Sequence, residues 1–295
     1  MTPGSVRTVL VGGHESADGE DLTRFAGLLD APAQVSAAGR TLDRAVSDAL
    51  AAGETVVVVP MTFGRNPTMV ADAAKTLRWL AAKNPGRLAL TAPFGQPDHL
   101  TAWLRTAANR ARASDSGDAL LIIAPRSNPF DEAELHRLAY LVAANGALPE
   151  VHVAIADDAE EVDRAADRVR RVAPGRVVAV PAGFAAHLPG ADVEQVAPLM
   201  SDAAVIRVIR SRVREALAAL AAGDDGIDTG LAADHGHGYA HSHTFEATAG
   251  HHHPHGGAAP HMHADGTVHA HGHGEARLVA AGREPVTTAS HEPHI

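Results

Sequence analysis

The chain has 295 residues, of which 45% are hydrophobic and 3% aromatic, and its formal net charge is −10 with histidine neutral. This length suits one large domain or two small ones, and the negative charge disfavours a nucleic-acid-binding surface. The absence of cysteine excludes disulfides and thiolate metal sites. The first apolar run is too short for a signal peptide and no stretch suits a membrane span, so we expect a cytoplasmic protein with no membrane partner.

Short β-branched runs alternate with longer helical patterns up to about residue 222. The runs that predict strands cover residues 6–11, 54–60, 87–93, 119–125, 151–156 and 176–181. Helical patterns lie between them, such as those at 20–30, 66–83 and 131–146, and a final one covers 205–223. Apolar strands separated by helices are typical of parallel βαβ units. The predicted fold class is α/β, with parallel sheets flanked by helices.

The second half of this region repeats the order of the first. VRTVLVGGHES has its counterpart in DALLIIAPRSNP, ETVVVVPMTFG in GRVVAVPAGFAAH, and LALTAPFGQPDHL in VEQVAPLMSDAAV. Alanine-rich α/β sequences resemble one another in general, but the Val-Pro and Ala-Pro turns match in the same order, which favours duplication. We therefore expect two similar lobes, residues 1–115 and 116–223, facing each other across a shared cleft.

Polar residues follow the carboxyl ends of several predicted strands, where ligands bind in open parallel sheets. These residues are His14 and Glu15 after the first strand, Arg65 and Asn66 after VVVVPMTFG, and Arg126 and His187 in the second lobe. If the lobes face each other, these side chains line one cleft. His99, His136 and His152 lie within or beside helix and strand patterns, and we expect structural roles for them.

These motifs resemble the sirohydrochlorin chelatases, the class II chelatases, in their long two-lobed form. The resemblance covers about residues 6–220 and rests on the VGGHES turn, the VVVVP strand with its loop, the APFGQPDHL segment and the duplication. It implies a chelatase-like fold and a cleft that binds a carboxylate-rich tetrapyrrole while a divalent metal ion is inserted. In the long form an arginine stands where the first lobe has its turn histidine, and Arg126 fits that position.

Metal insertion needs a group that holds the ion and a base that accepts pyrrole protons. A neutral imidazole ligates borderline metals and titrates near neutral pH, so His14 is the candidate ligand and base. Glu15 is the second candidate catalytic residue, because it can hold the ion, orient His14 or accept a proton. Arg65 and Arg126 are candidates for pairing with substrate carboxylates, and Asn66 for an anion site at a helix N-terminus.

The loop after VVVVP lacks the second histidine of the family, and Thr68 or a neighbour occupies its place. His187 is a candidate replacement ligand from the opposite lobe. The leading hypothesis is therefore a lyase-type chelatase that inserts cobalt, or alternatively iron, in cobalamin or siroheme biosynthesis. The alternative, which Thr68 favours, is a non-catalytic nickel, cobalt or zinc store or chaperone that keeps the fold.

Residues 224–295 have no apolar periodicity and are rich in Gly, Ala and His, so we expect a disordered tail. Fifteen of the 20 histidines fall there. Imidazole binds cobalt, nickel, copper and zinc with little discrimination, so the tail predicts metal binding without naming the metal. The candidate ligands are His235, His237, His241, His243, His251, His252, His253, His255, His261, His263, His269, His271 and His273.

Overall fold

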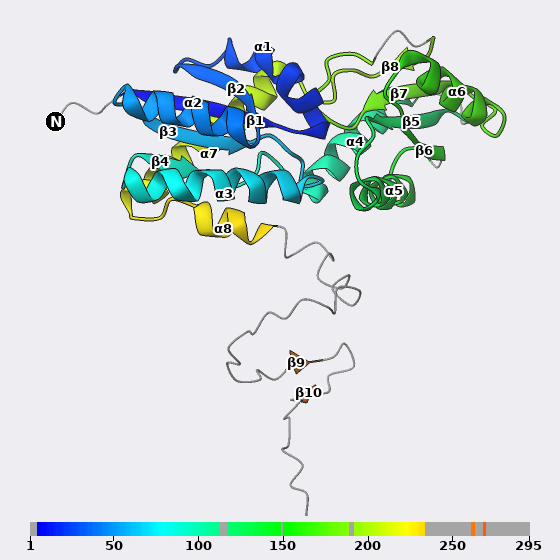
Figure 1. Ribbon diagram of the computed structural model, residues 1–295. Helices are drawn as coiled ribbons and strands as arrows, with labels where there is room; N and C mark the ends of the chain where they lie inside the picture. The colour runs from blue at the N-terminus through cyan, green and yellow to red at the C-terminus, as the bar shows by residue number, and fades with distance from the viewer. Residues whose placement is uncertain are drawn as a thin grey trace, which may run out of the picture. The chain divides into compact units, whose positions relative to one another are not determined.

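The computed structural model describes residues 5–112, 117–148, 150–188 and 192–233, together with two short strands near the C-terminus (Figure 1). The chain divides into two compact units, residues 1–242 and 243–295. The first unit contains two parallel sheets, each flanked by helices. Within the described residues, no helix has both the length and the apolar character needed to cross a bilayer.

The first sheet is built from four parallel strands in the order β2-β1-β3-β4. The strands are β1 (Val6–Gly12), β2 (Ala33–Ala37), β3 (Thr55–Pro60) and β4 (Leu88–Leu90). β1 and β3 consist largely of valine, whose branched side chain packs well on a pleated surface. Val9 and Leu10 are both fully buried although they point to opposite faces of the sheet, as expected where helices cover both faces.

The second sheet repeats this arrangement with the order β6-β5-β7-β8. Its strands are β5 (Ala119–Ala124), β6 (Glu150–Ile155), β7 (Val177–Pro181) and β8 (Glu194–Gln195). Val11 pairs with Pro60 in the first sheet, and Ile123 pairs with Pro181 in the second. The matching order and register confirm the predicted α/β class with two similar lobes, and they make His14 and Arg126 equivalent positions.

Helices cover both faces of the first sheet. The helices are η1 (His14–Leu22), α1 (Thr23–Ala26), α2 (Arg40–Ala51), α3 (Pro67–Lys83) and α7 (Asp202–Ala221). α2 and α3 pack on one face, where Leu42 and Leu77 contact the same cluster as Val9. α7 packs against Val57 and Ala89 of β3 and β4 on the other face.

The second sheet is covered by α6 (Ala159–Arg170) on one face and by α5 (Pro129–Ala144) and α4 (Pro97–Ala111) on the other. α4 follows the first sheet in sequence yet packs against α5 and β7, whereas α7 follows the second sheet and packs against β3 and β4 of the first. The lobes therefore exchange their last helices. This exchange ties the two sheets into one unit and was not expected from the sequence.

The six predicted strands are confirmed, but β2 and β8 were not predicted. The helix expected over residues 20–30 is confirmed only in its first part. Residues 20–22 end the 3₁₀ segment η1, the four-residue α1 follows, and the helix stops at Ala26. The positive φ angles of Ala17, Asp18 and Gly19 interrupt η1 before this helical part begins.

The ordered chain also continues beyond the boundary predicted at residue 223. A short helix, α8 (Ile227–Leu231), packs on α3 and β4, and the Leu90 amide donates to the Asp225 carbonyl at 2.8 Å. In the second unit, β9 (His261–Met262) pairs antiparallel with β10 (Val268–His269). Residues 234–260, 263–267 and 270–295 of the predicted tail lie outside the described residues.

Candidate active site between the lobes

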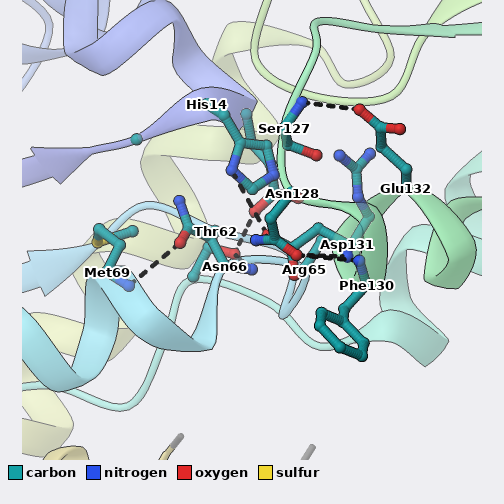
Figure 2. A network of polar contacts seen from close by, with 12 residues as sticks. His14, Thr62, Arg65, Asn66, Met69, Ser127, Asn128, Phe130, Asp131 and Glu132 are labelled. Carbon is teal, nitrogen blue, oxygen red and sulfur yellow. Dashed lines mark hydrogen bonds and ion pairs between the residues drawn. The ribbon is translucent and has the colours of Figure 1, made fainter. Parts of the chain in front are cut away.

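Two glycines place His14 at the carboxyl end of β1. A Cβ on Gly13 would lie 2.4 Å from Asn66 Nδ2, and a Cβ on Gly12 would lie 2.4 Å from the Gly19 backbone. Side chains at these positions would therefore push the turn away from α3 and η1. The Gly12-Gly13 pair lets the chain turn tightly over the edge of the sheet, so that His14 faces the second lobe (Figure 2).

His14 is half-buried against an acidic residue of the second lobe. Its Nδ1 lies 3.9 Å from Asp131 Oδ2, which comes from the first turn of α5. Its Nε2 is buried and has no hydrogen-bond partner among the described residues. Burial, and secondarily the positive charge of Arg65, lower the pKa of His14 to about 4. The imidazole is therefore neutral at physiological pH and keeps a lone pair for a metal ion.

Hydrogen bonds within the second lobe hold Asp131 in place. Asn128, the N-cap of α5, donates from Nδ2 to Asp131 Oδ2 at 2.6 Å, and its Oδ1 accepts from the Asp131 amide at 3.1 Å. The Asp131 side chain is 5% exposed. A carboxylate held in this way has a fixed orientation toward the histidine of the other lobe.

Glu15 is buried and points into its own lobe. Its carboxylate accepts a short hydrogen bond from the Thr62 hydroxyl and longer ones, at 3.2 and 3.3 Å, from the Phe63 amide. Burial raises the pKa of Glu15, while Arg65 and the Thr62 hydrogen bond oppose that rise. A carboxylate whose pKa is raised accepts a proton more readily than an exposed one.

The two lobes touch directly beside this cluster. The Glu15 carbonyl accepts from the Phe184 amide at 2.9 Å, and a Cβ on Gly183 would lie 2.3 Å from that same carbonyl. Phe63 and Phe184, which occupy equivalent positions in the two lobes, stack with their ring centroids 5.0 Å apart. The lobes are therefore closed on each other at this point.

A cavity of about 240 Å³ lies beside His14. His14, Glu15 and Asp21 line it from the first lobe, and the carboxyl ends of β5 and β7 line it from the second. Its volume is below the roughly 300–1,000 Å³ of typical ligand pockets. The cavity accommodates an ion and a few waters as it stands, so a macrocycle would need the lobes to part.

The residues predicted to bind anions already contact other groups of the protein. Arg65 is 1% exposed, its Nη1 lies 3.5 Å from the Ala182 carbonyl, and its Nε has no partner among the described residues. Asn66 caps α3 by accepting from the Met69 amide at 3.1 Å. Arg126 is exposed and forms ion pairs with Asp157 at 3.2 Å and Glu161 at 3.1 Å. In this conformation Arg65 is brought beside His14, whereas Arg126 faces acidic residues of its own lobe.

The remaining predicted metal ligands are not gathered at His14. His187 is exposed and does not line the His14 cavity, although the next residue, Leu188, does. Most predicted histidines of the tail lie outside the described residues, and only the backbones of His261 and His269 are described. Among the described residues, no three His, Asp or Glu side chains form a group that could hold a metal ion.

Sequence reasoning missed Asp131 and Thr62, which contact the two candidate catalytic residues. Asp131 lies in the NPFD sequence that begins the helix after β5, where an acidic residue is expected simply because it favours a helix N-terminus. Thr62 lies in the PMTF turn after β3. For Thr62 the repeated Pro-x-x-Phe motif was an available signal, because it places this turn and its counterpart after β7 at the interface between the lobes. It gave no signal for Asp131.

No protein-family model matches the chain, and no curated protein does. The solved structures that are similar to this chain include two at low identity. The structure of SirB from Bacillus subtilis with Fe³⁺ is 15% identical, with a TM-score of 0.47, and the match covers 76% of this chain and 99% of that one. A periplasmic ribose ABC transporter from Conexibacter woesei is 13% identical, with a TM-score of 0.35 and coverage of 61% and 64%. The assignment of the fold rests on the strand order of this chain and not on these two structures.

Proposed function

We propose that this protein is a chelatase that inserts a divalent metal ion into a tetrapyrrole of the sirohydrochlorin type. One observation carries the proposal: the buried Nε2 of His14 has no hydrogen-bond partner among the described residues, in a cavity between two lobes. An unpaired buried nitrogen is costly unless another group satisfies it, and a metal ion would do so. Cobalt is the ion we favour, with iron, nickel and zinc as further candidates.

The carboxylates around His14 suit the proton balance of the reaction. Insertion of M²⁺ breaks two pyrrole N–H bonds, so two protons must leave the macrocycle as its four ring nitrogens bind the metal ion. Asp131 stands 3.9 Å from His14 Nδ1, and burial raises the pKa of Glu15, which makes its carboxylate a better proton acceptor than an exposed one. In this proposal His14 holds the ion, which is a substrate, and the two carboxyl groups receive the protons.

The proposed function also gives a role to the histidine-rich tail and implies a cellular location. The histidines of residues 235–273 would raise the local concentration of the metal substrate, which requires no fixed geometry. A location in the cytoplasm fits this role, and the negatively charged chain would bind neither nucleic acid nor membrane. Arg65 and Arg126 would meet substrate carboxylates once the lobes part.

The alternative is a non-catalytic metal store or chaperone with the same fold. The small cavity favours it, and so do the ion pairs that already occupy Arg126. In that case metal binding would depend on the tail, and the closed interface between the lobes would be permanent.

A metal-insertion assay separates the two functions. Purified full-length protein is mixed with sirohydrochlorin and Co²⁺ under anaerobic conditions, and the absorption change is followed against a protein-free blank. The proposal predicts a rate above the blank that His14→Ala lowers to the blank, whereas His136→Ala, an exposed change on α5, leaves it unchanged. A wild-type rate equal to the blank, with metal still bound to the protein, would establish the storage function instead.

A further inference from the structure

A second cavity lies between the two exchanged helices, apart from His14. Its volume is about 390 Å³, within the usual range for small-molecule sites. α4 contributes His99 and Trp103, and the turns after β3 and β4 contribute Phe63 and Phe94. The rest of the lining comes from Met200 and from α7, and no lining residue is shared with the His14 cavity.

The inner part of this cavity is aromatic. Phe63 and Phe94 meet edge to face with their ring centroids 5.3 Å apart, and both are almost fully buried. The Trp103 indole and the Met200 thioether complete an apolar lining. Aromatic residues are only 3% of the chain, so three of them around one cavity form a concentrated surface for a flat ring.

The outer part is positively charged. Arg212 Nη1 lies 3.2 Å from Glu215, whose carboxylate also accepts from Ser211 at 2.8 Å, and the buried Arg212 Nε has no partner among the described residues. Arg207 forms no ion pair within the part of the chain that the structure describes. Glu215 therefore balances one arginine and leaves the charge of the other for a ligand.

His99 adds a directed donor to this side of the cavity. Its Nδ1 accepts from the Gln96 amide at 3.1 Å as part of the cap of α4. In the neutral ring the proton must then be on Nε2, so the remaining nitrogen can donate to a ligand.

We propose that this cavity binds a flat aromatic carboxylate. The ring lies against Trp103 and the phenylalanines, and the carboxylate pairs with the guanidinium groups of Arg207 and Arg212. Aromatic walls with two arginines at the opening provide both the apolar contact and the charge that such a ligand needs. The site is separate from the His14 cavity, because the two cavities share no lining residue, although the amide of Phe63 also holds the Glu15 carboxylate.

Calorimetry and NMR of the full chain with 2-naphthoate test this assignment, with neutral 2-naphthamide as the matched ligand. We expect saturable naphthoate binding that moves the Trp103 indole signal and leaves that of Trp79 in place, since Trp79 lies on α3 and is 68% exposed. A Trp79→Phe variant assigns the two signals. The amide should bind at least about tenfold more weakly, because it lacks a charge-assisted contact.

Substitutions on α7 test which arginines bind the carboxylate of the ligand. Arg207→Gln, alone and with Arg212→Gln, should weaken naphthoate binding about tenfold or more, since each substitution removes a charge-assisted hydrogen bond to the carboxylate. Arg40→Gln, an exposed position on α2 outside this cavity, should have no effect. The proposal is overturned if naphthoate does not saturate, if the amide binds equally well, or if the Arg40 variant weakens binding as much as the Arg207 variant.

Discussion

The pair His14-Glu15 shows how adjacent residues take opposite environments. His14 faces the second lobe and is neutral because burial and Arg65 lower its pKa to about 4, whereas Glu15 turns inward and is held by Thr62 and Phe63. The alternation follows from the tight turn after β1. His14 therefore reaches the interface between the lobes, whereas Glu15 fixes the turn.

The lowered pKa of His14 has a measurable effect on stability. An unfolded histidine binds its proton near pH 6.5, whereas His14 in the folded protein binds it near pH 4, so stability falls as the pH falls between these values. A shift of this size corresponds to on the order of 3 kcal/mol. His14→Gln should remove that part of the decline, which urea unfolding of the metal-free protein at pH 7, 5.5 and 4 measures. An unchanged pH profile in the variant would contradict the buried, neutral histidine.

The hydrogen bond from Thr62 to Glu15 predicts a second effect. Thr62→Val keeps the shape of the side chain but removes the hydroxyl that donates to the buried carboxylate and accepts from the Gly64 and Asn66 amides. This loss should cost about 1–3 kcal/mol of unfolding free energy. Thr106→Val is the control, because the Thr106 hydroxyl bonds only to the Ala102 carbonyl on an exposed helix surface. The control should change stability by less than about 0.5 kcal/mol. Equal effects of the two substitutions would exclude the assigned role of Thr62.

At the scale of elements, the sequence predicted those strands that have a strong apolar signal. β1, β3, β5 and β7 are rich in Val, Leu and Ile, but β2, with the sequence AQVSA, has a single β-branched residue, and β8 has two residues. The exchange of α4 and α7 could not be predicted, because an apolar helix face does not indicate which sheet it covers. The turn position of His14 could be predicted from strand order, but the burial of Arg65 depends on Ala182 of the other lobe.

The contact between the turn after β7 and Glu15 predicts a strict need for glycine at position 183. In Gly183→Ala the new methyl group would lie 2.3 Å from the Glu15 carbonyl, so the lobes would have to move apart. We expect a loss of about 1–3 kcal/mol in unfolding free energy and faster hydrogen exchange at the Phe184 amide. Gly27→Ala serves as the control, since its nearest neighbour would be 3.8 Å away. Unchanged exchange at Phe184 in the Gly183 variant would argue against a tight interface.

At the scale of the whole molecule, α8 joins the two-lobed unit to the histidine-rich segment. Ile227 is 3% exposed in the cluster formed by α2, α3 and the first sheet, and Leu231 packs against the same cluster. The end of the folded unit therefore lies beyond Gly223, where the helical pattern of α7 stops. The sequence gives little sign of this, because α8 contributes only two large apolar side chains.

Two truncations test this boundary. A chain ending at residue 223 loses Ile227 and the bond from the Leu90 amide to Asp225, and should be about 2–4 kcal/mol less stable than a chain ending at residue 233. The longer truncation should match the full chain. Guanidinium unfolding measures all three proteins, and equal stability of the two truncations would remove α8 from the folded unit.

The proposed function requires that the closed lobes move apart so that a tetrapyrrole can reach His14. Because the chain has no cysteine, spin labels can be attached at Arg44→Cys on α2 and Arg168→Cys on α6, both exposed and on opposite lobes. Pulsed electron paramagnetic resonance then measures the distance between the labels with and without metal-free sirohydrochlorin. We expect a saturating concentration of sirohydrochlorin to shift the distances between the labels to longer values. An unchanged distribution at saturation would contradict it.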